Sequence, residues 1–354
     1  MEKKYLVLAA FALVSCSEKW NDIAHEEVVA VIDDFAVENQ EKCVIDKIEK
    51  TIALTLPYDA DPSAAVVTQF TVTEGARCTP AIKVGDRIDV SSPLTLTLRT
   101  YDDYTWTVTA TVKPKPTSDI YNMDFDEWSK DFFGLDVPYG DGADSEEKAV
   151  WGPAGFLMAL ATGGSPVLSM ETDTVAVKGE GKAAVKLQSL YSDALPALVN
   201  GTVFSGAMIS FESNILHAKL GVPFKKRPVS MDGYALYKPK VIDHTAEPYT
   251  DKAGTLDNAY VFFALADWDS QYEVSPPAMI MEGIDTIPGI IGYGKATFDR
   301  QTDNFEKFSI KIDYLNSNTP KYAVILAGSS ALGDFGTGAA GSVLFLDELG
   351  FVYE

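Results

Sequence analysis

The chain has little of several residue types on which protein chemistry commonly depends. Its 354 residues include only three cysteines and three histidines. His25, His217 and His244 lack the spacing of zinc ligands, and no Gly-x-Ser-x-Gly elbow is present, so zinc catalysis and Ser-His-Asp catalysis are both disfavoured. A nucleotide-binding loop is missing as well, because residues 161–165 lack the lysine and the helix that should follow.

Basic residues are also scarce, since 29 of them face 51 acidic residues and leave a formal charge of -22 at pH 7. A field of that sign repels nucleic acids and anionic lipid headgroups, so we expect no nucleic-acid partner. It is compatible with neutral or cationic ligands and with divalent cations.

Long apolar runs are missing, and the one near the N-terminus is too short to cross a bilayer. Lys3 and Lys4 precede the apolar residues 5–14, an order that is typical of an export signal. The sequence Leu13-Val14-Ser15-Cys16 then resembles the lipobox of bacterial lipoproteins. That resemblance implies a signal peptide over residues 1–15, acyl chains on Cys16, a tether over residues 16–29, and a lipid-anchored protein at the outer membrane or cell surface. An ordinary secretory signal with an incidental cysteine is the alternative.

The two remaining cysteines, Cys43 and Cys78, are the only possible disulfide of an exported chain. We therefore predict a bond between them. Two buried free thiols that behave as small hydrophobic side chains are the alternative.

Residues 30–113 alternate between polar and apolar side chains with the period of two that half-buried strands show. The pattern is clear at residues 51–56, 93–99 and 105–112, and no convincing amphipathic helix interrupts it. About seven short strands in this length predict an immunoglobulin-like sandwich. The proline-rich residues 114–118 predict an interdomain linker, since two prolines in three residues cannot sit in a central strand.

Residues 119–354 carry further strand patterns, separated by long loops that are rich in Gly, Pro and Asp. These patterns fall at residues 183–187, 260–265, 305–312, 322–327 and 342–346. The length and the all-β pattern predict one larger jelly-roll β-sandwich rather than two small domains.

Segments along this second region match one family in the right order: Asp124-Phe125-Asp126-Glu127-Trp128, Val150-Trp151-Gly152, and residues 201–206, 221–228, 233–239 and 341–348. In them the chain resembles the putative carbohydrate metabolism domain of Bacteroidetes surface lipoproteins, and residues 30–113 resemble the immunoglobulin-like modules that often precede it. The resemblance implies a jelly-roll related to carbohydrate-binding modules and some glycoside hydrolases, and a role in glycan handling. It supplies no catalytic motif.

Tryptophan side chains are candidates for binding a saccharide, because an aromatic face packs against the apolar face of a sugar ring. Trp151 follows an acidic loop and precedes Gly152-Pro153, a loop setting that suits an exposed platform; a buried plug at the sandwich edge is the alternative. Trp268 offers a ring between two carboxylates, Asp267 and Asp269, although ordinary turn chemistry explains these residues equally well.

Two tyrosines and an arginine complete the predicted saccharide-binding set. Tyr234 and Tyr237 are three residues apart, so in a strand they face opposite sides and at most one belongs to a given site. Arg227 precedes a proline in extended backbone, where its guanidinium is a candidate clamp for a hydroxyl or a carboxylate. A structural salt bridge is the alternative for Arg227.

Carboxylates raise two further hypotheses. Jelly-roll carbohydrate modules commonly hold a structural calcium ion where the first and last strands meet, and Asp124, Asp126 and Asp347 are candidate ligands; ordinary strand-end acids are the alternative. No cofactor is required for binding itself. Hydrolysis of a glycosidic bond needs two carboxyl groups about 5 Å or about 6.5–9.5 Å apart, and the sequence offers too many to choose a pair: Asp126, Glu127, Asp267, Asp269, Glu273 and Glu282.

These observations predict a surface lipoprotein whose partner is an oligosaccharide or polysaccharide. A glycoside hydrolase with a carboxylate pair is the first alternative, and a structural or adhesive subunit with envelope protein partners is the second. An open groove with aromatic residues favours binding, and a deep pocket with a spaced carboxyl pair favours hydrolysis. A flat apolar patch of more than a few hundred Å2 favours a protein partner.

Overall fold

The computed structural model describes residues 28–152, 163–177, 181–193, 196–212 and 215–353. The predicted signal peptide, Cys16 and most of the predicted tether lie outside them. The regular structure of the described residues consists of β-strands and short 3-10 helices, which confirms the all-β prediction. None of the described helices is both long enough and apolar enough to span a membrane.

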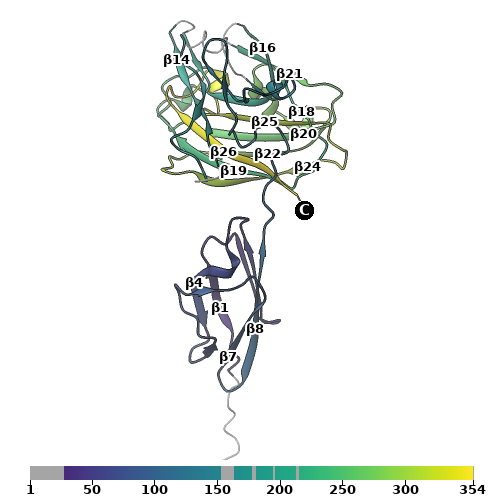
Figure 1. Cartoon of the computed structure of the whole chain (residues 1–354). Coiled ribbons are helices and arrows are strands. Elements are labelled where there is room, and N and C mark those ends of the chain that lie inside the picture. The colour runs from purple at the N-terminus through teal and green to yellow at the C-terminus, as the bar shows by residue number, and fades with distance from the viewer. Residues whose placement is uncertain (1–27, 153–162, 178–180, 194–195, 213–214, 354) are drawn as a thin grey trace, which may run out of the picture. The chain divides into compact units, whose positions relative to one another are not determined.

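The described residues form two compact units, and the boundary between them falls between Lys115 and Pro116 in the proline-rich segment (Figure 1). The first unit is a sandwich of two sheets around a core that contains Ile32, Leu54, Leu96 and the fully buried Trp106. One sheet has the order β1 (Ile32–Val37), β4 (Ala65–Val72), β6 (Arg87–Ile88). The other has the order β2 (Lys42–Asp46), β3 (Thr51–Leu56), β8 (Asp103–Val112), β7 (Leu94–Arg99), β5 (Arg77–Thr79), and the helix η1 spans Pro62–Ala64.

The predicted Cys43–Cys78 disulfide is wrong, because both thiols are free. Cys43 lies on β2 and Cys78 on β5, the two opposite edge strands of the five-stranded sheet. Three strands between them, at a spacing of about 4.8 Å, separate the two residues by at least roughly 19 Å across the sheet, and they are also offset along the strands. A disulfide requires Cα atoms within about 7 Å. Each thiol is partly buried, and that burial raises its pKa.

We expect an alkylating reagent to label both Cys43 and Cys78 in denatured protein that has not been reduced. Peptide mass spectrometry measures the labelled fraction of each cysteine. A parallel sample treated with reductant is the control, and it should give the same labelled fractions. Labelling of these two peptides that depends on the reductant would show a disulfide and contradict the structure.

The second unit is a larger sandwich. Its smaller sheet has the order β12 (Leu168–Glu171), β13 (Ala184–Gln188), β26 (Val343–Val352), β19 (Ser230–Lys238), β23 (Glu306–Lys311). Its larger sheet has the order β21 (Tyr272–Val274), β17 (Ile215–Leu220), β16 (Thr202–Glu212), β25 (Tyr322–Gly328), β20 (Ala259–Ala266), β22 (Ile290–Phe298), β24 (Asp313–Tyr314), with β11 (Trp151–Gly152) beside β16 and β18 (Val222–Pro223) beside β25. Figure 1 shows β25, β20 and β22 as neighbouring strands of this sheet.

Short elements decorate this sandwich. Two hairpins pair β9 (Ser129–Lys130) with β10 (Asp136–Val137) and β14 (Leu190–Ser192) with β15 (Ala197–Val199). The 3-10 helices are η2 (Glu147–Ala149), η3 (Thr250–Lys252), η4 (Pro277–Met281), η5 (Ile284–Thr286) and η6 (Gly333–Phe335).

The strand β20 in the larger sheet is buried on both faces. Val261, Phe263 and Leu265 of β20 pack in the core between the two sheets, together with Leu344 and Leu346 of β26. The alternate residues of β20, Tyr260 to Ala266, belong to a second cluster with Ile280 of η4 and Ile284 of η5. Loops and short helices therefore cover the outer face of β20, so its centre is not an open platform for a ligand.

Candidate functional site

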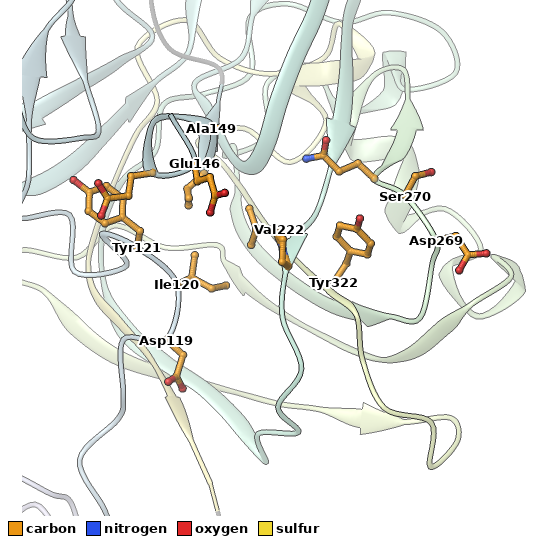
Figure 2. A pocket seen from close by; sticks show the side chains of 13 residues that line it. Asp119, Ile120, Tyr121, Glu146, Ala149, Val222, Asp269, Ser270 and Tyr322 are labelled. Carbon is orange, nitrogen blue, oxygen red and sulfur yellow. The ribbon is translucent and has the colours of Figure 1, made fainter. Parts of the chain in front are cut away.

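A groove of about 710 Å3 opens in the second unit (Figure 2). Five segments line it: residues 119–121, residues 146–150 without Lys148, the strand β18, residues 269–271, and Tyr322 at the start of β25. Figure 2 shows Tyr121 and Glu146 on one side, Ser270 and Asp269 on the other, and Val222 between them. The pairing of β18 with β25 brings Val222 and Tyr322 together from distant parts of the chain.

Hydrogen bonds fix the wall that carries Tyr121. The Tyr121 hydroxyl donates to Glu127 Oε2 over 2.7 Å and accepts from the backbone N–H of Gly140 over 3.1 Å. Burial raises the pKa of Tyr121, and the charges of Glu127 and Glu147 raise it further, against the opposing Gly140 bond. The ring is thus a neutral, oriented surface at the edge of the groove.

The opposite wall is a turn between β20 and β21 whose ends are pinned together. The rings of Trp268 and Tyr272 stack with their centroids 4.9 Å apart and their planes at 20°. The three residues between them, 269–271, line the groove, and Gln271 Nε2 donates to the carbonyl oxygen of Gly221 over 2.8 Å. Gly221 has a φ of +105°, and a Cβ there would lie 3.3 Å from Tyr322, so this close approach requires glycine.

The acidic residues of the groove differ in how their charge is balanced. Asp119 pairs with Lys226, and Asp269 pairs with Lys321 at 2.7 Å. Burial pushes the pKa of Asp119 upward, but hydrogen bonds from Lys226, Tyr353 and Thr117 hold it below its ordinary value. The hydrogen bond from Lys321 likewise lowers the pKa of the exposed Asp269. These two carboxylates are therefore ionised and locally compensated.

Trp151 does not form an exposed platform, so that part of the prediction is wrong. Its side chain is only 4% exposed and packs in the main core, 5.2 Å from the ring of Phe125. Its indole N–H donates to the carbonyl oxygen of Tyr121 over 2.8 Å. Trp151 is the buried alternative, and it supports the Tyr121 wall from behind.

Replacing Trp151 by alanine should destabilise the protein by about 3–5 kcal/mol, because the change removes a buried ring and leaves a cavity. Trp151→Phe keeps most of the packing and should cost less, with about 1 kcal/mol from the lost hydrogen bond. Urea unfolding measures both changes. Phe132→Ala, at a side chain that is 95% exposed, is the control and should change stability by less than about 0.5 kcal/mol. Equal stability of Trp151→Ala and the control would contradict a core role.

Two further predicted saccharide ligands, Tyr237 and Arg227, are engaged in structural contacts. Tyr237 is 1% exposed, and its hydroxyl donates to the Ser329 carbonyl oxygen over 3.0 Å. Arg227 donates to the carbonyl oxygens of Asn316 and Asn318 and lies 4.0 Å from the Tyr314 ring centroid. The guanidinium therefore binds backbone oxygens of a neighbouring loop and is not free to clamp a ligand. Among the described residues Arg227 forms no salt bridge either.

Tyr234 is half-buried and does not line the groove. It pairs with Asp347 across β19 and β26, whereas Tyr237 lies in the core between the sheets. The two tyrosines therefore face opposite sides of β19.

The three residues around Trp268 do not form one binding turn. Asp267 accepts a hydrogen bond from Asn318 Nδ2 over 2.7 Å, and the Trp268 indole N–H donates to the Pro288 carbonyl oxygen over 2.8 Å. Only Asp269 lines the groove. Trp268 holds the turn in place by stacking on Tyr272, and it does not line the groove. The prediction of a sugar-binding ring beside two carboxylates is therefore wrong.

Two of the three predicted calcium ligands come close together, but their oxygens are largely used. Asp126 Oδ1 accepts from the backbone N–H groups of Lys182 and Ala183, and Asp347 Oδ2 accepts from Ala176 N over 2.7 Å. Only Asp347 Oδ1 is buried without a partner. Among the described residues no three carboxylate, histidine or cysteine side chains could hold a metal ion, whereas calcium needs six to eight oxygens. The described part of the chain therefore does not fit the predicted calcium site, and Asp124 adds nothing to it.

Asp347 is instead a buried carboxyl group that holds a proton. Burial, together with the charges of Glu348 and Asp126, raises its pKa to about 7 from an ordinary value of 3.8. Between these two values the folded chain binds a proton that the unfolded chain has released, so stability falls as the pH rises. The contribution is complete below about pH 4 and is lost as the pH passes about 7.

Asp347→Asn should remove this pH dependence, because the amide stays neutral. We expect the stability of the wild type relative to the variant to fall by about 2–3 kcal/mol between pH 5 and pH 8. Urea unfolding at the two pH values measures the difference, and Asp303→Asn at an exposed loop position is the control. Parallel pH profiles for the wild type and Asp347→Asn would rule out this role.

Two protein-family profiles match the chain. Residues 124–352 match the sequence profile of the putative carbohydrate metabolism domain, and residues 32–112 match the one described as "SGBP, N-terminal". The chain belongs to the putative carbohydrate metabolism domain family. Its second unit is a carbohydrate-handling domain of this family, and the groove lies within that unit. Curated proteins give no match.

Several solved structures are similar to the chain. A putative glycoside hydrolase from Bacteroides thetaiotaomicron is 20% identical, with 92% of this chain and 97% of that chain covered and a TM-score of 0.49. One from Bacteroides vulgatus is 15% identical, with 90% and 98% covered and a TM-score of 0.44. A carbohydrate-binding module specific for non-crystalline cellulose is 12% identical, with 57% and 86% covered and a TM-score of 0.27.

Most of the residues that line the groove were not predicted from the sequence. Glu146 and Glu147 belong to the acidic loop that precedes Trp151. This loop is evident in the sequence, but the predicted ligand there was Trp151 and not the glutamates. Tyr322 is the first residue of an apolar strand pattern, and Gln271 has no distinguishing context. Of the candidate carboxylates for hydrolysis, Asp269 alone lines the groove.

Proposed function

We propose that the protein binds oligosaccharide or polysaccharide chains in the groove of its second unit. The observation that supports this most directly is an open groove in which Tyr121 and Tyr322 stand among hydrogen-bonding groups, on a domain of a carbohydrate family. Tyrosine rings provide apolar faces for sugar rings, and the amide and carboxylate groups provide partners for sugar hydroxyls.

The cellular setting of this proposal is a lipid anchor on Cys16 at the outer membrane or cell surface. The match of residues 32–112 to the N-terminal domain of SGBP-type proteins supports a surface glycan-binding role. In this arrangement the first unit lies along the chain between the lipid anchor and the unit that carries the groove. The lipid is the only membrane contact that we propose.

Hydrolysis in the same groove is the alternative that the lining carboxylates favour. Asp119, Glu146, Glu147 and Asp269 all reach the groove, and a glycoside hydrolase requires two suitably spaced carboxyl groups. Ion pairing of Asp119 and Asp269 lowers the pKa of each, which disfavours both as the general acid, since that role needs a raised pKa. This leaves Glu146 and Glu147 on one wall, so binding is the better supported function. A protein partner would favour a flat apolar patch, whereas this site is an open groove whose lining includes four carboxylates and several hydrogen-bonding side chains.

Tyr322→Ala should weaken saccharide binding roughly tenfold, because it removes one aromatic face from the groove. A glycan array identifies the saccharide, and calorimetry with that saccharide measures the Kd. Tyr191→Ala is the matched control, since Tyr191 is 39% exposed on the distant β14–β15 hairpin and does not line the groove. We expect its affinity to stay within about twofold of the wild type.

The array and product analysis together separate the alternatives. Binding without release of reducing sugar supports the proposed function, and binding with release supports the hydrolase. Absence of binding across plant, host and microbial glycans would overturn the proposal.

A further inference from the structure

The charge of the groove is concentrated on one wall. Glu147 is half-buried and Glu146 is exposed, and both line the groove beside Tyr121. Within the described residues neither glutamate forms an ion pair, and the only side-chain bond of Glu147 is one that Oε2 accepts from Asp144 N. The adjacent Lys148 points its ammonium group at the ring of Tyr139, 5.7 Å from the centroid.

The opposite wall carries no uncompensated charge. Asp269 is paired with Lys321, and Ser270, Gln271 and Tyr322 are neutral hydrogen-bonding groups. Asp119, which also lines the groove, is paired with Lys226. Among the described residues no lysine, arginine or histidine lines the groove, so the two glutamates at one wall set its electrostatic potential.

We propose that the groove selects neutral or amine-bearing saccharides and excludes uronate and sulfate-bearing ones, through the Glu146–Glu147 wall. This inference rests on the proposed saccharide-binding function and names the class of glycan that the same groove accepts. A hydroxyl-rich neutral sugar donates hydrogen bonds to these carboxylates, and a protonated amine adds charge attraction. A sugar carboxylate or sulfate has no cationic partner in the groove and is repelled by both glutamates.

The size of the effect follows from the distance between charges in a wet groove. At roughly 6–8 Å and an effective dielectric constant between about 40 and 80, each glutamate disfavours an anionic group by roughly three- to tenfold. Two glutamates together give a discrimination of roughly tenfold or more. Because the groove is open to solvent, salt at molar concentration should reduce this discrimination.

The test uses the protein with three β-1,4-linked probes that share a backbone and differ in charge: cellohexaose, a glucosamine hexamer and an oxidised cellulose oligomer with C6 carboxylates. A matched pair on a second, α-1,4-linked backbone uses polygalacturonate and fully methyl-esterified polygalacturonate. Affinity electrophoresis and calorimetry give the ratio of Kd values for the anionic and neutral members of each set. We expect this ratio to be about ten or more, and methyl esterification to restore binding.

Glu146→Gln combined with Glu147→Gln should lower the anionic-to-neutral Kd ratio at least about threefold. Glu247→Gln combined with Glu282→Gln is the matched control, because it removes the same net charge from exposed positions outside the groove and should leave the ratio unchanged. An equal fall in both double variants would assign the selectivity to net charge and overturn the inference.

The two proposals fail in different ways. Binding of anionic and neutral members with equal affinity overturns the selectivity while the saccharide-binding function stands. Binding of none of these probes, nor of any neutral, cationic or anionic glycan on an array, overturns the proposed function and this inference with it.

Discussion

The burial of both faces of β20 is the constraint on which the rest of the second unit depends. Its eight residues are all buried, one side packing between the two sheets and the other beneath η4, η5 and neighbouring loops. Each large side chain on such a strand contributes roughly 1.5–3 kcal/mol of burial free energy. The strand can keep that contribution only if a covering layer stays in place on its outer face.

This covering layer decides where a ligand can bind. A jelly-roll whose broad face is exposed offers a platform on its strands, but here loops occupy the corresponding surface over β20. The groove lies instead where β18, the turn after β20, residues 119–121 and η2 meet. Its walls are loops, but they are held by core contacts, namely the Trp151 indole bond to Tyr121 and the Trp268–Tyr272 stack. The aromatic residues that look most like ligands in the sequence thus position the ones that line the groove.

Carboxyl groups in the core and carboxyl groups in the groove are stabilised in different ways. The sandwich holds a carboxyl group, Asp347, that burial keeps protonated well above its ordinary pKa. Lysine partners keep Asp119 and Asp269 of the groove ionised, whereas Glu146 and Glu147 have no lysine partner among the described residues. Charge is therefore stabilised by pairing at the rim and avoided in the core, which is the expected consequence of desolvation.

The sequence by itself determined the all-β class and the position of the main strands. Burial can be read directly from two patterns. Period-two alternation, as at residues 51–56 and 93–99, indicates a strand with one buried face, and the apolar run at 260–265 indicates a strand buried on both faces. The carbohydrate family was also readable, since its segments follow one another along the chain. Tertiary structure alone decided which residues share a site. Tyr121, Tyr322 and Gln271 are far apart in sequence. Tyr322 and Gln271 reach the groove through β18–β25 pairing and the Gln271–Gly221 hydrogen bond, and the Trp151 indole bond holds Tyr121. Likewise, the edge positions of β2 and β5 separate Cys43 from Cys78, and no spacing along the chain encodes strand order in a sheet.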